Sequence, residues 1–165
     1  MILTAFPVGF FAGYFGIGGG LISVPVLFFI FEAAEVDKKY LMHLSVGTSF
    51  SIIILTSLVS VITHKKHKAV DINIIKNYGA FVIIGVFTGT LMAALLQTKF
   101  LVLFFAVVVY FFGGYLLLVN QEIKKTHTFK TYHKIIFGFI SGFISAPMGV
   151  TGAMMNVPIL RYFGY

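Results

Sequence analysis

Charged residues are scarce in this 165-residue chain, and cysteine and tryptophan are absent. Only 10% of the residues are charged and the mean hydropathy is +1.00, whereas a soluble domain carries roughly 25% charged residues. So few charges cannot cover a water-exposed globule, which argues against a soluble enzyme or nucleic-acid module. The absence of cysteine excludes disulfides, thiolate metal sites and cysteine nucleophiles.

The charged residues are separated by long apolar stretches. Five stretches of 22 residues or more contain no Asp, Glu, Lys or Arg: 1–31, 40–64, 77–98, 100–121 and 135–160. A membrane-spanning helix needs roughly 20 mostly apolar residues, and each stretch is long enough. Because these runs are continuous rather than alternating, helices are favoured over strands. We therefore expect an all-α fold, a polytopic transmembrane helical bundle.

The charges between the stretches predict the orientation of the chain. Residues 65–76 and 122–134 each carry a net charge of +3, whereas residues 32–39 carry −1. Lys and Arg in short loops mark the cytoplasmic side. We expect a multi-pass protein of the cell (inner) membrane with its basic loops, 64–76 and 122–134, in the cytoplasm. The lipid bilayer is then its partner, and no nucleic acid is expected.

The first and last stretches resemble each other and differ from the three between them. Both contain a G-x-x-x-G pattern, a glycine-rich centre and a Val-Pro exit, and all four prolines lie in them. The aligned pairs are Gly9/Gly138, Gly13/Gly142, Gly19/Gly152, Ser23/Asn156 and Val24-Pro25/Val157-Pro158. Unrelated apolar helices would not share all of these features, so we expect an internal repeat.

The repeat divides the chain into three parts. Residues 1–120 form a first transmembrane repeat, 121–134 a basic cytoplasmic loop, and 135–165 the start of a second repeat. The segments expected in the first repeat are 1–31, 41–63, 77–97 and 100–119. Because the second repeat holds one segment against four, we expect a fragment of a protein with about three more helices.

Two topologies stay open for the first segment. A single pass would place Met1 in the cytoplasm and make the two repeats parallel. A re-entrant dip would place Met1 outside and allow the repeats to be inverted. The sequence alone favours neither of them.

The glycine-rich centres predict helix breaks at membrane depth. Residues 16–20 contain four glycines and are followed by Pro25. Each glycine costs about 1 kcal/mol relative to Ala in a helix interior, and proline removes a backbone donor. A restarting helix presents free N–H groups and its positive dipole end to the break. Two such breaks, the second at 145–152, would meet near the midplane and hold an anion, as in repeat-built transporters.

We expect these breaks and the polar side chains near them to bind a small anionic substrate. The candidate substrate-binding residues are Gly16, Gly18, Gly19, Gly20, Ser23, Thr48, Ser49, Ser145, Gly149, Thr151, Gly152 and Asn156. His43 is a possible coupling residue, because no apolar segment contains Asp, Glu or Lys. We expect no catalytic residue, no metal and no cofactor. Close helix packing is the alternative role of glycine, and we favour it for Gly9/Gly13, Gly85/Gly89 and Gly138/Gly142.

Several of these motifs together resemble the TauE/SafE family of membrane exporters. They are Gly13-x-x-Gly16-x-Gly18-Gly19-Gly20 with Pro25, His43 with Gly47-Thr48-Ser49, His64-Lys65-Lys66 with Val70-Asp71, and the glycine-rich return at 138–160. The resemblance implies a two-repeat, non-enzymatic transporter that exports sulfite, sulfonates or other small anions. The second repeat departs from the pattern, because Ser145-Ala-Pro-Met-Gly149-Val-Thr151-Gly152 replaces a plainer G-x-G-G-G. A non-transporting membrane scaffold is the alternative function.

Overall fold

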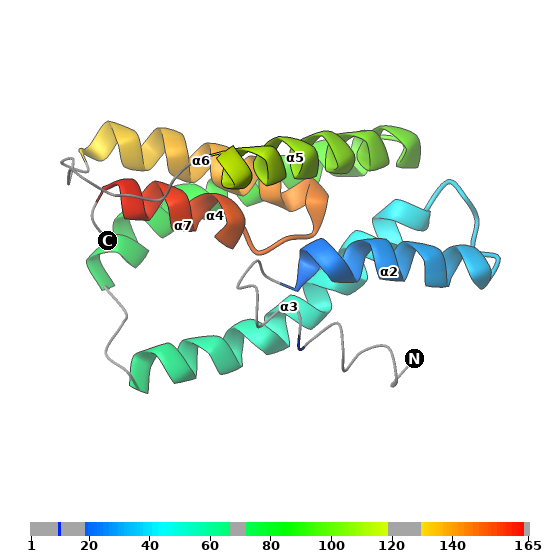
Figure 1. Ribbon diagram of the computed structural model, residues 1–165, viewed down its shortest axis with the longest axis horizontal. Coiled ribbons are helices and arrows are strands. Elements are labelled where there is room, and N and C mark those ends of the chain that lie inside the picture. The colour runs from blue at the N-terminus through cyan, green and yellow to red at the C-terminus, as the bar shows by residue number, and fades with distance from the viewer. Residues whose placement is uncertain (1–9, 11–18, 67–71, 119–129, 164–165) are drawn as a thin grey trace.

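A computed structural model describes Phe10 and residues 19–66, 72–118 and 130–163. Within these ranges the chain forms six α-helices and no strand (Figure 1). The helices are α2 (Gly20–Ala33), α3 (Leu41–Lys66), α4 (Ile72–Leu95), α5 (Thr98–Leu118), α6 (Thr131–Met148) and α7 (Ala153–Tyr162). The expected all-α class is confirmed.

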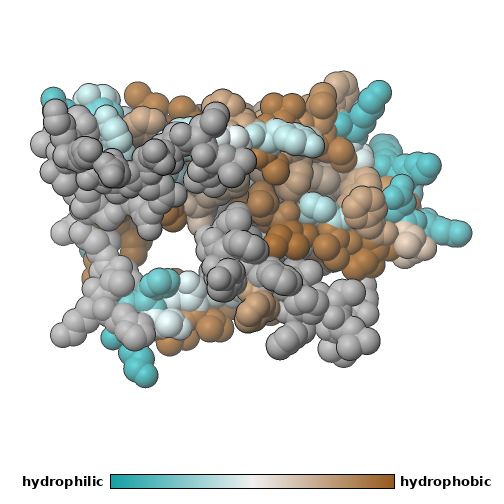
Figure 2. All heavy atoms as spheres, viewed as in Figure 1, coloured by the Kyte–Doolittle hydropathy of each residue, from teal (hydrophilic) through white to brown (hydrophobic). Residues whose placement is uncertain are grey.

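Three of the helices are long and apolar enough to cross a membrane. They contain the spans Leu41–Lys66, Ile74–Leu95 and Thr98–Tyr115. Large apolar side chains on these helices are exposed, for example Leu55 at 68% and Ile83 at 70%. Figure 2 shows apolar surface along the middle of the molecule and hydrophilic residues gathered toward the ends of its long axis. This distribution suits helices surrounded by hydrocarbon.

The last apolar stretch does not cross as a single rod. It folds into α6 and α7, which run antiparallel: Ser141 of α6 donates a hydrogen bond to Asn156 of α7, and the His133 ring lies 5.0 Å from that of Phe163. The start of α6 and the end of α7 therefore lie at the same end of the bundle (Figure 1). The stretch is a helical hairpin, where the sequence had led us to expect a single crossing segment.

Two glycines shape the tip of this hairpin. Gly149 has φ +63° and Gly152 has φ +69°, a region that side-chain-bearing residues rarely adopt. The N–H of Gly149 donates to the Ala146 carbonyl and that of Val150 to the Ser145 carbonyl, at 3.2 and 3.3 Å. These two bonds are the Schellman pattern that satisfies the last carbonyls of a helix and turns the chain away from its axis.

Helices α4 and α6 pack through glycine. A Cβ at Gly142 would overlap the carbonyl oxygen of Val82 and lie 2.8 Å from the nitrogen of Val86. A Cβ at Gly85 would overlap Phe139 in the same way. Close contact at Gly85, Gly89, Gly138 and Gly142 is what a packing role for these glycines requires. Gly9 and Gly13 lie outside the described residues.

The turns between the helices form two groups. Thr98, at the start of α5, donates a hydrogen bond of 2.5 Å to the Lys39 carbonyl, so the α2–α3 and α4–α5 turns lie at one end. The end of α3 and the start of α4 lie at the other end, near the open ends of the α6–α7 hairpin (Figure 1). A small core of Val24, Met42, Val46 and Leu101 joins α2, α3 and α5.

Candidate functional site

The start of α2 packs directly against the tip of the α6–α7 hairpin. A Cβ at Gly20 would overlap the carbonyl oxygen of Gly149 and lie 2.8 Å from the Cα of Val150. Only glycine lets two backbones approach so closely. The structure thus brings the described end of the first glycine-rich stretch against the break in the last one. The candidates Gly16 and Gly18 lie outside the described residues.

The two glycines aligned in the sequence, Gly19 and Gly152, take the same position in the fold. Each lies directly before a helix, and its carbonyl accepts the first hydrogen bonds of that helix. Gly19 accepts from Ile22 and Ser23 at 3.3 and 2.9 Å, and Gly152 accepts from Met155 and Asn156 at 3.1 and 2.9 Å. The positive dipole ends of α2 and α7 are therefore both found at the region where the two stretches meet.

Two buried serines hold α2 and α3 onto the hairpin tip. The Ser49 hydroxyl donates to the Gly149 carbonyl at 2.9 Å, and the Ser23 and Ser49 hydroxyl oxygens lie 2.9 Å apart. Because a serine has one proton, Ser49 must accept from Ser23. Ser49 is 0% exposed and Ser23 is 8% exposed. In this state both predicted ligand hydroxyls donate to protein atoms, so their first role is to fix the tip.

The other predicted residues are spread around this contact. Ser145 is buried and donates to the Gly142 carbonyl at 3.1 Å. Thr48 is half-buried on α3, and Thr151 is exposed in the loop before α7.

His43 lies in the first turn of α3 and joins that helix to the end of α4. Its Nε2 donates to the Ala93 carbonyl at 3.2 Å, which fixes the proton on that nitrogen. Its Nδ1 is buried and has no hydrogen-bond partner among the described residues. The ring therefore ties two helices together and does not reach the hairpin tip through a hydrogen bond.

Asn156 joins a polar cluster that the sequence reasoning missed in part. Tyr78 of α4 donates to its Oδ1 at 2.7 Å, and Ser141 of α6 donates to the same atom. Neither Tyr78 nor Ser141 was singled out from the sequence. Ser141 had a visible signal, because it lies one helical turn before Ser145 on the face that carries Gly138 and Gly142. Tyr78 had no such signal in the sequence, because α4 and α7 come together only in the folded structure.

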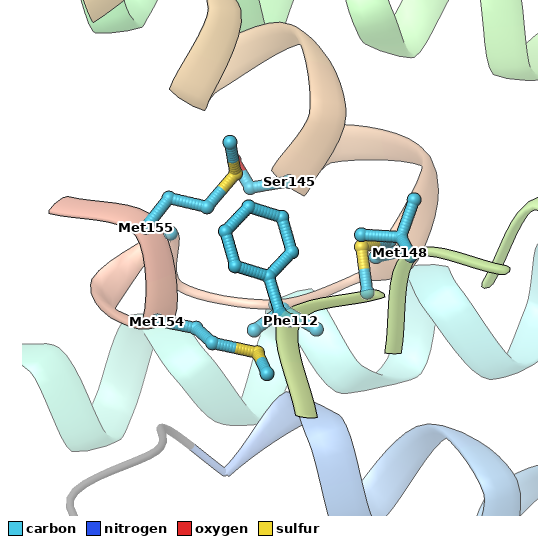
Figure 3. Close-up of a pocket in the computed structure, with 8 residues that line it drawn as sticks. Phe112, Ser145, Met148, Met154 and Met155 are labelled. Atoms are coloured by element: carbon cyan, nitrogen blue, oxygen red, sulfur yellow. The ribbon is translucent and has the colours of Figure 1, made fainter. Parts of the chain in front are cut away.

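A small pocket adjoins the same break. Phe112 of α5 points into it between methionine side chains, as Figure 3 shows. Its lining residues are Val108, Phe112, Ser145, Met148, Val150, Gly152, Met154 and Met155. The walls are mostly apolar, and methionine side chains adapt readily to different shapes. Within the described ranges, no three His, Asp or Glu side chains are grouped so that they could hold a metal ion.

These features define a class: a multi-pass helical membrane protein in which a helical hairpin meets the glycine-rich start of another helix. The family model for the sulfite exporter TauE/SafE family matches residues 1–165. The chain belongs to this family, which confirms the resemblance seen in its motifs.

Curated relatives carry a consistent description. The chain is 29% identical to a probable membrane transporter protein of Haemophilus influenzae, covering 99% of this chain and 62% of the relative. It is also 29% identical to the probable membrane transporter protein MJ0441 of Methanocaldococcus jannaschii, covering 100% and 62%. The chain thus spans 62% of the length of each of these two relatives. No solved structure matches it.

Proposed function

We propose that the protein is a membrane transporter that exports small sulfur-containing or organic anions of the sulfite and sulfonate type across the inner membrane. Membership of the TauE/SafE family and relatives described as probable membrane transporters support this function. The proposed pathway passes between the glycine-rich start of α2 and the break between α6 and α7. No catalytic step is part of the proposal.

One observation carries the proposal: the backbone of Gly20 lies against that of Gly149 and Val150. Two interrupted helices meeting inside the bundle are the usual plan of a transporter site, in which helix N-termini face an anionic group. Non-helical backbone at membrane depth is tolerated only inside protein or beside a water-filled cavity. Residues 149–152, between α6 and α7, are backbone of this kind.

In the proposed site, backbone N–H groups hold the anion and side chains add further donors. The N–H groups at the starts of α2 and α7 have no carbonyl four residues earlier within their own helix. Glycine allows an oxyanion to approach them closely. Asn156 lies on the first turn of α7 and adds an amide, while Thr48 and Thr151 add hydroxyls.

The directions of α2 and α7 support inverted repeats. These helices begin at the aligned glycines, Gly19 and Gly152. From their meeting point α2 runs toward the α2–α3 turn, whereas α7 runs toward the opposite end of the bundle (Figure 1). Helices related by an inverted repeat have this relation, and those of a parallel repeat do not. The end of α3 and the starts of α4 and α6, which flank the basic loops 64–76 and 122–134, lie toward the end to which α7 runs (Figure 1). We assign this end to the cytoplasm.

The substitution Gly19→Leu tests the site directly. A Cβ at Gly19 meets no atom within 4 Å among the described residues, so a side chain can begin there without meeting the described backbone, directly before α2. We expect the full-length protein with Gly19→Leu to insert normally and to lose radiolabelled sulfite flux in proteoliposomes. Gly113→Leu on α5, which is also open within 4 Å, is the matched control and should retain flux. Wild-type flux in Gly19→Leu would contradict the proposed site.

The rival function, a non-transporting scaffold, has one observation in its favour. Gly85, Gly89, Gly138 and Gly142 serve helix packing and need no ligand to explain them. Packing does not explain the positive φ angles of Gly149 and Gly152. A scaffold would show no sulfite-dependent change in thermal unfolding, whereas the proposed transporter should be stabilised by sulfite in a concentration-dependent manner.

A further inference from the structure

We infer that Tyr78 and Ser141 are positioning residues that orient the side-chain amide of Asn156 so that its N–H groups face the break and the substrate anion. This inference rests on the proposed function, because it assigns the donor that the site presents and the groups that aim it. Tyr78 belongs to the crossing helix α4, Ser141 to α6 and Asn156 to α7.

The hydrogen bonds fix which way the amide points. The Tyr78 hydroxyl, 2.7 Å away, and the Ser141 hydroxyl both donate to Asn156 Oδ1. A carbonyl oxygen has two lone pairs, so these two bonds saturate it. Because the amide is planar, Nδ2 must then point away from both hydroxyls. The two N–H bonds of Nδ2 have no hydrogen-bond partner among the residues that the structure describes.

The amide nitrogen faces the break itself. A Cβ built at Gly152 would lie 3.3 Å from Asn156 Nδ2 and 3.5 Å from the hydroxyl oxygens of Ser141 and Ser145. The position that a side chain of Gly152 would take is therefore bordered by three polar atoms, next to the first turn of α7. The two hydroxyls already donate to Asn156 Oδ1 and to the Gly142 carbonyl, so Asn156 Nδ2 is the atom of the three with hydrogens left to offer an oxyanion at the break.

A purely structural role explains the cluster poorly. At Gly85 and Gly142 the backbones of α4 and α6 touch through glycine itself, so close contact at these positions does not require polar side chains. Tyr78 is 4% exposed and Ser141 is 0% exposed. Burying polar groups at membrane depth is costly, and such groups are a mark of substrate pathways.

The test measures the KM for radiolabelled sulfite flux, and sulfite-dependent thermal stabilisation, in full-length protein carrying Tyr78→Phe or Ser141→Ala. Each variant frees the amide to turn, so we expect KM to rise roughly three- to tenfold, the effect of losing one hydrogen bond. The maximal rate should change less than KM. The matched controls are Tyr110→Phe, at a side chain 83% exposed on α5, and Ser57→Ala, an exposed serine on α3; both should keep the wild-type KM.

Asn156→Asp provides the sharper chemical test. A carboxylate accepts from both hydroxyls as the amide does, so the cluster keeps its shape, but it offers no N–H and adds a negative charge. We expect its apparent affinity for sulfite to fall roughly tenfold or more. Asn77→Asp, at an exposed position on α4, is the control and should behave as wild type.

The outcomes separate this inference from the proposed function. If wild-type protein shows neither sulfite flux nor sulfite-dependent stabilisation, the proposed function fails and the inference fails with it. If wild type is active but Tyr78→Phe and Ser141→Ala both match their controls in KM, only the inference fails. If these two variants lose thermal stability without any rise in KM, Tyr78 and Ser141 are structural and the inference is again overturned.

Discussion

Among the described residues, glycine brings α4 against α6 and α2 against the hairpin tip, and the two contacts differ in kind. Between α4 and α6, Gly85 and Gly142 lie inside helices that continue on both sides of the contact. Between α2 and the hairpin tip, Gly20 touches Gly149, which directly follows the end of α6. The Gly149 carbonyl there accepts a hydrogen bond from the Ser49 hydroxyl. The same residue type thus serves packing in one place and an interrupted backbone in the other. What separates the two roles is whether the helix continues.

The largest loss of stability should come from breaking the contact between α4 and α6. In Gly142→Ala the new methyl group meets backbone atoms of α4, which cannot move aside as a side chain can. We expect a loss of stability of about 1–3 kcal/mol or more, the cost of overpacking a rigid contact. Thermal unfolding in detergent measures it, with Gly113→Ala as the control because its Cβ would meet nothing within 4 Å. An unchanged unfolding midpoint would mean that α4 and α6 do not pack as described.

Gly20→Ala breaks the contact between α2 and the hairpin tip and should lower sulfite flux more than it lowers stability. The added methyl group overlaps the Gly149 carbonyl and would push α2 away from the hairpin tip. We expect sulfite flux to be lost, with a smaller fall in unfolding midpoint than for Gly142→Ala, because Gly20 is the first residue of its helix whereas Gly142 lies inside α6. Flux in proteoliposomes and thermal unfolding should be measured on the same preparation. If Gly20→Ala lowered the unfolding midpoint as much as Gly142→Ala but still transported sulfite, the contact between α2 and the hairpin tip would serve packing and not transport.

Replacing Ser49 or Ser23 should give the smallest effects, and the loss of stability should differ between the two. Ser49→Ala leaves the buried Gly149 carbonyl without its donor, which costs about 1–3 kcal/mol. Ser23→Ala leaves that bond intact and should cost less, about 0.5–1.5 kcal/mol. In the double variant the two losses should not add, because Ser23 acts on the tip only through Ser49. Strictly additive losses in denaturant unfolding would show that the two hydroxyls work independently.

The sequence was sufficient to predict helices and the position of one break, because both depend on local chemistry. Long charge-free stretches can satisfy their backbone groups in a membrane only as helices. Gly149 and Gly152 fall where α6 ends and α7 begins, as the glycine-rich pattern indicated. The alignment of Gly19 with Gly152 also matches a shared position before a helix.

The direction in which the chain leaves the break could not be predicted in the same way. A 26-residue apolar stretch is long enough to cross the membrane or to enter and return, and hydropathy is the same for both. The return depends on the left-handed conformation of Gly149 and on the hydrogen bond between Ser141 and Asn156. Both are properties of the folded backbone.

The amino-acid sequence by itself determined that this protein lies in the membrane, which stretches form helices and where the last stretch is weak enough to break. These properties follow from hydropathy and from the local cost of glycine and proline. Only the tertiary structure decided that α6 packs on α4, that the last stretch turns back, and that Tyr78 and Ser141 reach Asn156. Such pairings join residues distant in the sequence, and their choice among many similar apolar helices depends on close backbone contact, which no single segment encodes.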